Sequence, residues 1–430
     1  MTMRSRLYRL GSQLGVGAVI VGLLVSVGGR LAYGPRAEAH SPKSLPNNFP
    51  FLNSNGFAAT FSTQGFVNLS GEYFQPQGSK GRSCSTCQMP ENAWRINTAT
   101  ISLLFELTGG THPIFNALDA DNPNNDLSTV EARRANYSMM LTRGVFRRGG
   151  APRANREWDV VAVDDPHGFA NVNQIVQWRR VVPTINFNLG SATVNWDGGN
   201  TVGSDQLAGL VKQANGNITG AQQGQPAPPE VIADIVNFET SLSTAQAVSF
   251  SVGPLNGQGA RGGPEELSQM TKTQGRFDLF DAWTNSPVPS RRQIARGREL
   301  FNSVNSGGRS CSGCHNSANN GTNINDTLFD TGTAPAEART PDLPLYTFRN
   351  RATGEERQLT DTGAGNVTGL WKDMGRFKTP TLRALSARAP YFHNGSAATL
   401  EDVVRHYEQF LGFVFTDEER EDLVAFLKAL

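Results

Sequence analysis

Cysteine is scarce in this chain, with four residues in 430, and histidine is nearly as scarce, with six. All four cysteines fall in two C-x-x-C pairs, Cys84/Cys87 and Cys311/Cys314. So few cysteines in this pattern argue against a disulfide framework, and a chain of this length can bury its core without one. The cysteines are therefore expected to have a chemical role, such as holding a cofactor, rather than to form structural disulfides.

Charge is also sparse: 18% of the residues are charged, and 39 basic residues nearly balance 38 acidic ones. Nucleic acids are bound by strongly basic surfaces, so this balance predicts no nucleic-acid partner. Glycine and proline supply 45 and 23 residues, which indicates long ordered loops around a helical core.

The N-terminal segment has the layout of a secretory signal. Three arginines within the first nine residues precede an apolar run over 14–27, and Ala-Glu-Ala stands at 37–39. We expect cleavage after residue 39, which leaves 34 basic and 37 acidic residues, a formal charge of −3, in a periplasmic protein. The alternative is an uncleaved membrane anchor over 10–29, which six glycines weaken.

Two segments of the chain repeat each other. Residues 81–88 read GRSCSTCQ and residues 308–315 read GRSCSGCH, which are identical at six of eight positions. A fainter echo pairs DIVNF at 234–238 with DLVAF at 422–426, each within an amphipathic helical pattern. The repeats predict two related domains.

Helix signals close each half of the chain. The first helix is expected to begin near Pro229, and a capping box formed by Thr416 and Glu419 introduces the second. We therefore predict a mainly α fold with long ordered loops, divided into domains over 40–285 and 286–430.

The segment from Cys311 to His315 is a C-x-x-C-H motif. Two thiols at this spacing reach the two vinyl groups of one haem, while the adjacent histidine ligates the iron. A zinc knuckle would require further ligand pairs, and a thioredoxin-like pair would require a βαβ setting; neither context is present. The motif predicts a haem c bonded to Cys311 and Cys314, with His315 as the proximal iron ligand.

Two residues compete for the other axial position of this iron. Met374 follows His315 by 59 residues, a spacing that suits thioether ligation in small cytochromes. Tyr407 lies on the apolar stripe of a helix that Thr399 caps, so its ring is expected to face inward, as a ligand or as a core aromatic.

A polar loop region surrounds these candidates. Its cations Arg376, Lys378 and Arg383 are candidates for pairing with the haem propionates, or are otherwise a solvated basic surface. His393 is expected to support the haem pocket, whereas His167 reads as a turn or surface histidine.

Three segments that follow the C-x-x-C-H motif resemble the bacterial di-haem cytochrome c peroxidase and MauG superfamily. They are GRFKTPTLR at 375–383, APYFHNGSAATLEDVVRHY at 389–407 and DLVAFLKAL at 422–430. In the first half, Trp196-Asp197-Gly198 resembles the family's W-D-G segment. The resemblance implies two cytochrome c-like, mainly helical domains.

The resemblance also implies roles for individual residues. In the family an N-terminal haem meets hydrogen peroxide and a six-coordinate C-terminal haem relays electrons, with a tryptophan between them that Trp196 matches. Tyr407 resembles the position of the distal ligand, so we favour it over Met374, which implies a low-potential relay haem. A calcium ion between the domains and a homodimer are implied as well.

The first motif departs from the family because Gln88 replaces the expected histidine in C-x-x-C-Q. In one interpretation Cys84 and Cys87 bind no haem, and the N-terminal domain is a scaffold. In another, a second haem is attached there and its iron takes a different ligand, such as Gln88, Met89 or His112. The third is another metal or redox use of the pair, for which no further ligands lie close in sequence.

The sequence therefore predicts an exported c-type haem oxidoreductase of the peroxidase or MauG kind. Electrons would pass through the haem at Cys311 to or from a redox partner, with peroxide-dependent oxidation at the altered first site. The alternative is a single-haem electron carrier whose N-terminal domain docks a partner, and a third candidate is MauG-like oxidation of a partner protein through Trp196.

Overall fold

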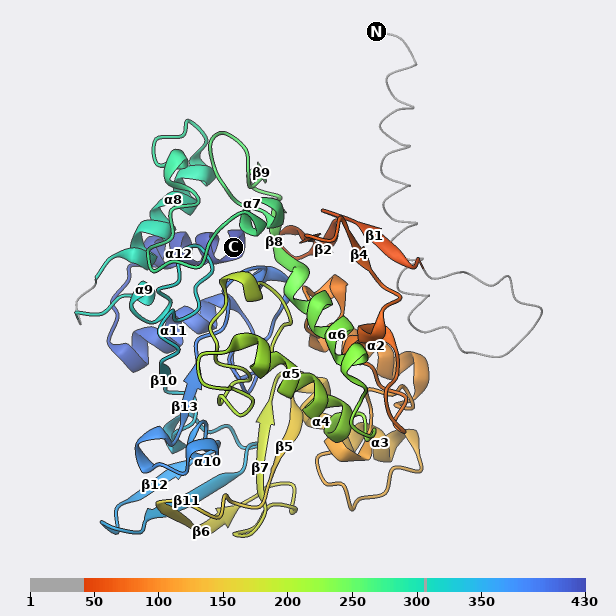
Figure 1. Ribbon diagram of the computed structural model, residues 1–430. Coiled ribbons are helices and arrows are strands. Elements are labelled where there is room, and N and C mark those ends of the chain that lie inside the picture. Colours follow the sequence, from red (N-terminus) through yellow and green to blue (C-terminus); the bar gives the residue numbers. More distant parts are fainter. Residues whose placement is uncertain (1–41, 305–307) are drawn as a thin grey trace.

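The computed structural model describes residues 42–304 and 308–430 (Figure 1). The predicted signal segment at 1–39 lies outside the described residues. Within those residues, no helix combines the length and apolar composition needed to cross a bilayer.

Helices form the larger part of the regular structure: of the described residues, 34% lie in helices when short 3-10 and π turns are included, against 18% in strands and isolated bridges. The helices are α2 (Thr98–Thr108), α3 (Val130–Asn136), α4 (Ser138–Arg143), α5 (Gln206–Gly216), α6 (Pro229–Ser241), α7 (Pro264–Ser268), α8 (Pro289–Asn302), α9 (Cys311–Cys314), α10 (Gly365–Thr368), α11 (Leu400–Leu411) and α12 (Asp417–Ala429).

The strands are short and gather in small antiparallel sheets that the expectation of a mainly α fold did not include. They are β1 (Ser44–Pro46), β2 (Phe51–Asn53), β3 (Gly56–Ser62), β4 (Phe66–Asn68), β5 (Phe146–Gly150), β6 (Trp158–Asp164), β7 (Ile175–Arg179), β8 (Leu242–Ser249), β9 (Gly253–Pro254), β10 (Leu328–Asp330), β11 (Leu345–Asn350), β12 (Glu356–Leu359) and β13 (Arg376–Lys378).

The helix starts read from the sequence are confirmed. Helix α6 begins at Pro229, and α12 begins after Thr416, whose hydroxyl accepts the Glu419 N–H while Glu419 caps the Thr416 N–H in return. These reciprocal bonds satisfy two backbone donors that a helix otherwise leaves without partners.

Strands from the two halves pair with one another. Strand β6 pairs antiparallel with β11, which also pairs with β12, and the three lie side by side in Figure 1. An apolar cluster here joins Trp158 and Trp196 to Tyr346, Phe348 and other residues of the second half. Another cluster joins residues 252–283 to α8, α11 and α12. The domain boundary near 285 stays a prediction.

The packing of α8 against α12 depends on Gly297. A Cβ atom at this position would lie 1.9 Å from the carbonyl oxygen of Asp422, so the two backbones approach too closely for any side chain. Arg296 binds the Asp422 carboxylate at the same contact, with N–O distances of 2.6 and 2.7 Å. Both helices contribute to the apolar cluster against which Cys311 of the second motif packs.

Gly297→Ala is expected to lower the free energy of unfolding by about 1–3 kcal/mol, because the added methyl group must push α8 and α12 apart. Urea unfolding followed by circular dichroism measures the loss. Gly216→Ala is the matched control: this α5 glycine has only the Asn200 side chain 4.0 Å from the added Cβ. Equal stability of the two variants would contradict the packing argument.

Candidate functional site

The second motif opens onto a cavity with an apolar wall. Cys311 and Cys314 of α9, followed by His315, line it on one side, and apolar residues of α11 face them. The cavity encloses about 1440 Å³, including space open to solvent. We call it the Cys311 cavity.

The imidazole of His315 is oriented for metal binding. Its Nδ1 lies 2.5 Å from the carbonyl oxygen of Gly321; a carbonyl can only accept, so Nδ1 carries the proton and Nε2 keeps its lone pair. Burial lowers the pKa of His315 to about 4, opposed by this hydrogen bond, so the ring is neutral at pH 7. A neutral imidazole with a free Nε2 is the form that ligates iron.

Tyr407 of α11 lines the same cavity as the motif residues, and Met374 does not. Burial and then the two nearby thiols raise the pKa of Tyr407 well above its usual range. Met374 packs instead with Trp158 and Trp371 in the apolar cluster beside β11. The structure therefore places Tyr407 in the same cavity wall as Cys311, Cys314 and His315, and it leaves Met374 outside that cavity.

The three cations expected to meet haem propionates differ in their placement. Only Lys378 lines the Cys311 cavity; its Nζ donates to the Thr193 carbonyl at 2.7 Å, and burial, partly opposed by Asp326, lowers its pKa to about 8. Arg376 donates to backbone carbonyls and lines no described cavity wall. Arg383 is fully buried but also lies outside the wall.

Three other arginines were missed by the sequence analysis. Arg95 and Arg388 line the Cys311 cavity, and Arg180 lies close to both, with relative exposures of 5%, 2% and 1%. Burial and then mutual repulsion lower the pKa of Arg95, and burial lowers that of Arg180 to about 9 and of Arg388 to about 10. No described carboxylate forms an ion pair with any of them.

The guanidinium of Arg95 is the least satisfied of the three, because its Nε and one Nη have no described hydrogen-bond partner. Buried cations normally have anionic partners, since an unpaired buried charge costs several kcal/mol. Two thiols, a free imidazole nitrogen, an apolar wall and cations that lack acids together fit a haem c with its two carboxylates. No motif marks Arg95 or Arg388 in the sequence.

The first motif opens onto a second, more polar cavity. Cys84, Cys87 and Gln88 line it together with arginines that include Arg82 and Arg148, and it encloses about 2200 Å³, including open solvent. We call it the Cys84 cavity. Burial raises the pKa of the Cys87 thiol to about 11 and that of Cys84 further. Thiols used in redox exchange have lowered pKa values, so this setting disfavours a dithiol redox centre.

Gln88 occupies the position of the missing histidine, and the protein itself binds its side chain. The amide Nε2 donates to the Val182 carbonyl at 2.8 Å, and the Tyr73 hydroxyl lies 3.5 Å from Oε1. The other two ligand candidates lie outside both cavities: Met89 packs with α2, and His112 accepts the Ile114 N–H within its own loop. Of the three, only Gln88 borders the Cys84 cavity.

His167 lies outside both cavities as well. Its Nε2 is 2.9 Å from the Asp342 carbonyl oxygen, and its Nδ1 is 4.0 Å from Asp121. Within 42–304 and 308–430, no three His, Cys, Asp or Glu side chains are grouped as around a metal ion. The calcium site, which would draw on carbonyl oxygens, stays a prediction.

Trp196 forms part of the wall between the two cavities. It lines both of them, as do Pro183 and Lys378. The indole Nε1 donates to the Arg180 carbonyl at 2.7 Å, which fixes the ring. The ring of Trp196 therefore borders both cavities, and its role as an electron relay stays a prediction.

Comparisons with known proteins find relatives among cytochrome c peroxidases and MauG proteins. No family model matches the chain. The cytochrome-c peroxidase IdrP1 of Denitromonas iodatirespirans is 31% identical over 178 residues, covering 37% of this chain and 45% of that protein. The cytochrome c551 peroxidase of Nitrosomonas europaea is 45% identical over 69 residues, covering 16% of this chain and 21% of that one.

MauG of Methylorubrum extorquens is 40% identical over 65 residues, covering 13% of this chain and 18% of that protein. The chain thus spans less than half the length of these curated relatives. The matched segments are similar to bacterial cytochrome c peroxidases and to MauG, which confirms the resemblance read from the sequence. A solved MauG-like protein associated with microbial copper homeostasis aligns over 93% of this chain and 95% of that one, with 16% identity; its TM-score of 0.41 is too low to define the fold.

Gln88→His is expected to raise the haem content of the Cys84 cavity, because it restores the histidine that a C-x-x-C motif places against iron. The haemochrome spectrum of the Cys311→Ser/Cys314→Ser variant, with and without Gln88→His, isolates the first site. Gln88→Asn is the control, since it shortens the side chain without adding an imidazole. Equal haem content in all three proteins would show that more than the ligand is missing.

Proposed function

We propose that this protein is an exported c-type haem oxidoreductase of the peroxidase type. One haem would be bonded to Cys311 and Cys314, with His315 and Tyr407 as its axial ligands. The observation that carries the proposal is that both thiols, His315 with its Nδ1 bound to Gly321, and Arg95 with its unpaired guanidinium line one apolar cavity.

The protein supplies binding, orientation and charge to this site, while a bound haem supplies one-electron chemistry. His315 would bind the iron through an imidazole that its hydrogen bond to Gly321 orients. Arg95 and Arg388 would neutralise the haem carboxylates, and the apolar side chains of α11 exclude water from one face. An anionic phenolate from Tyr407 would stabilise ferric iron and lower the reduction potential.

Electron transfer between the two cavities would pass through Trp196. The ring borders both cavities and is held by its bond to Arg180, so it needs no movement to connect them. Peroxide would react at the Cys84 cavity, which is the larger and more polar of the two. Export to the periplasm, a protein electron donor, a homodimer and a bound calcium ion complete the proposal.

The second candidate function is a single-haem electron carrier. Gln88 favours it, because this side chain is committed to Val182 and offers no strong iron ligand. In that case the first half of the chain serves as a scaffold or docking module. MauG-like oxidation of a partner protein through Trp196 requires a reactive first site and ranks below both.

Peroxide turnover separates these functions. We expect the purified holoprotein to oxidise a reduced small c-type cytochrome when hydrogen peroxide is added, and Cys84→Ser/Cys87→Ser to lose this activity while still accepting electrons at the Cys311 site. Electron uptake without peroxide turnover in the unaltered protein would instead establish the carrier function.

The axial ligand is tested by spectroscopy of the ferric protein. Tyr407→Phe is expected to change its near-infrared and electron paramagnetic resonance spectra, because the phenol oxygen is lost from the cavity that contains His315. Met374→Leu is the control, because it replaces a buried side chain by one of similar volume at a position outside that cavity. A spectrum altered only by Met374→Leu would overturn the assignment.

A further inference from the structure

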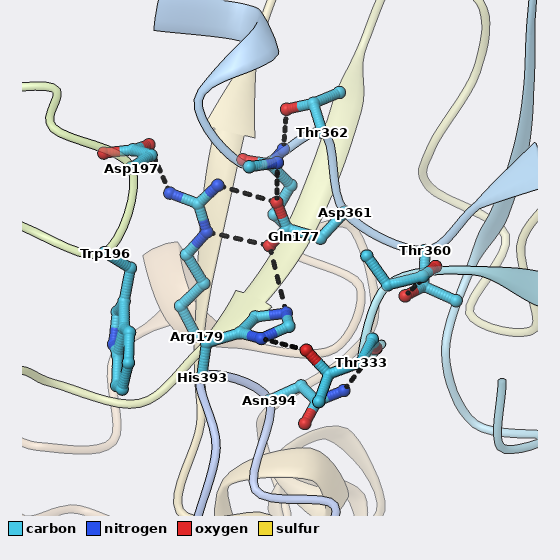
Figure 2. Close-up of polar contacts among 12 residues, drawn as sticks. Gln177, Arg179, Trp196, Asp197, Thr333, Thr360, Asp361, Thr362, His393 and Asn394 are labelled. Carbon is cyan, nitrogen blue, oxygen red and sulfur yellow. Dashed lines mark hydrogen bonds and ion pairs between the residues drawn. The ribbon is translucent and has the colours of Figure 1, made fainter. Parts of the chain in front are cut away.

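A buried chain of polar side chains runs between the two cavities beside Trp196 (Figure 2). Arg179 binds Asp361 through two hydrogen bonds of 2.8 and 2.7 Å and also pairs with Asp197. Asp361 Oδ2 lies 3.6 Å from the Nε2 atom of His393. The His393 Nδ1 atom is 3.2 Å from the Thr333 hydroxyl.

The two ends of this chain face different cavities. Arg179 and Asp197 line the Cys84 cavity, whereas His393 and Thr333 line the Cys311 cavity. Asp361 lies in neither wall and is 2% exposed, as is His393. Asp361 therefore contacts one residue of each cavity wall, Arg179 and His393.

Asp361 is fixed as an anion. Burial works against its ionisation, but the Arg179 guanidinium, with the Gly363 N–H at 2.7 Å, holds the pKa of this carboxyl below its usual range. With Asp197 also paired to Arg179, the chain has two carboxylates for one cation. His393 faces this excess negative charge.

Within this row of polar side chains, His393 is the residue that is able to gain a proton. Burial lowers its pKa to about 4, Asp361 acts to raise it and Arg179 to lower it, so the ring is neutral at pH 7. Its Nε2 has no described hydrogen-bond partner, although Asp361 is nearby. The ring is held in place by stacking on Phe377, with centroids 3.9 Å apart.

Other charged neighbours do not compete for this ring. Arg180 meets His393 only through its backbone N–H, 2.6 Å from the His393 carbonyl oxygen. Trp196, whose ring centroid is 6.4 Å away, is uncharged. Lys378 lines the same cavity and gains or loses its proton near pH 8, above the range in which His393 is expected to respond.

We propose that His393 takes up a proton when the haem site of the Cys311 cavity is reduced, and that Asp361, held by Arg179, is the positioning residue that stabilises the resulting imidazolium. The electron comes from the external donor, and the proton comes from solvent. Reduction adds negative charge to a cavity of low dielectric constant, which raises the proton affinity of a histidine in its wall. This inference rests on the proposed haem at Cys311.

The consequence is a reduction potential that depends on pH. The pKa of His393 is low in the oxidised protein and higher in the reduced protein, so between the two values one proton accompanies each electron. The potential then falls by up to about 59 mV for each tenfold drop in proton concentration. Below the lower pKa the ring is protonated in both states, and above the higher pKa in neither, so the potential is flat there.

Redox titration of the full-length holoprotein between pH 4 and 7, followed at the absorption bands of the Cys311 haem in the Cys84→Ser/Cys87→Ser background, tests the proposal. We expect a falling potential in this background protein and a flattened profile after His393→Asn or, independently, after Asp361→Asn. Asp422→Asn is the control, because it disrupts another Arg–Asp pair, in which the carboxylate is buried and Arg296 is half-exposed, and whose two residues line neither cavity.

A flat profile in the background protein, or an unchanged slope in either folded variant, would overturn the role of His393 and assign the proton elsewhere, for example to Lys378 or the haem carboxylates. The haemochrome spectrum of the same samples keeps this result separate from the proposed function. Absence of covalent haem at Cys311 would overturn both, whereas normal haem content with an unchanged slope overturns only the proton uptake.

Discussion

The burial of Arg95, Arg180 and Arg388 without acidic partners is the constraint on which the rest of the site depends. Three guanidinium groups that repel one another in a desolvated wall cost free energy unless anions enter the cavities beside them. A haem brings two carboxylates on a flat apolar ring, which matches the apolar wall opposite Cys311. The thiols and His315 would then determine where a bound haem lies in the cavity.

Much of this site was readable from the sequence, because its signals are local. The C-x-x-C-H motif, the Thr416 and Thr399 capping boxes and the start of α6 depend on residues a few positions apart. The sheets were missed because their pairing is not local: β6 and β11 are short strands nearly two hundred residues apart, and their register follows from tertiary packing. The arginine group was missed for the same reason, since Arg95 and Arg388 come together only in the fold.

The two motifs share a sequence pattern but face different surroundings. The Cys311 cavity is apolar and is lined by a histidine whose Nε2 keeps its lone pair, while the Cys84 cavity is more polar and its Gln88 is bound to Val182. Trp196 and the polar side chains Asp197, Arg179, Asp361 and His393 lie between the two cavities, and these polar side chains join the cavity walls through ion-pair contacts. This asymmetry is consistent with a relay site and a separate, altered site in one chain.

The central claim is that Cys311 and Cys314 hold a haem. The most direct measurement is the intact mass of the denatured protein, produced in cells that attach haem in the periplasm, compared with that of Cys311→Ser/Cys314→Ser. The account predicts that the unaltered chain carries covalent haem and that the double variant carries one haem fewer. A chain with no covalent haem, or an equal number in both proteins, would contradict it.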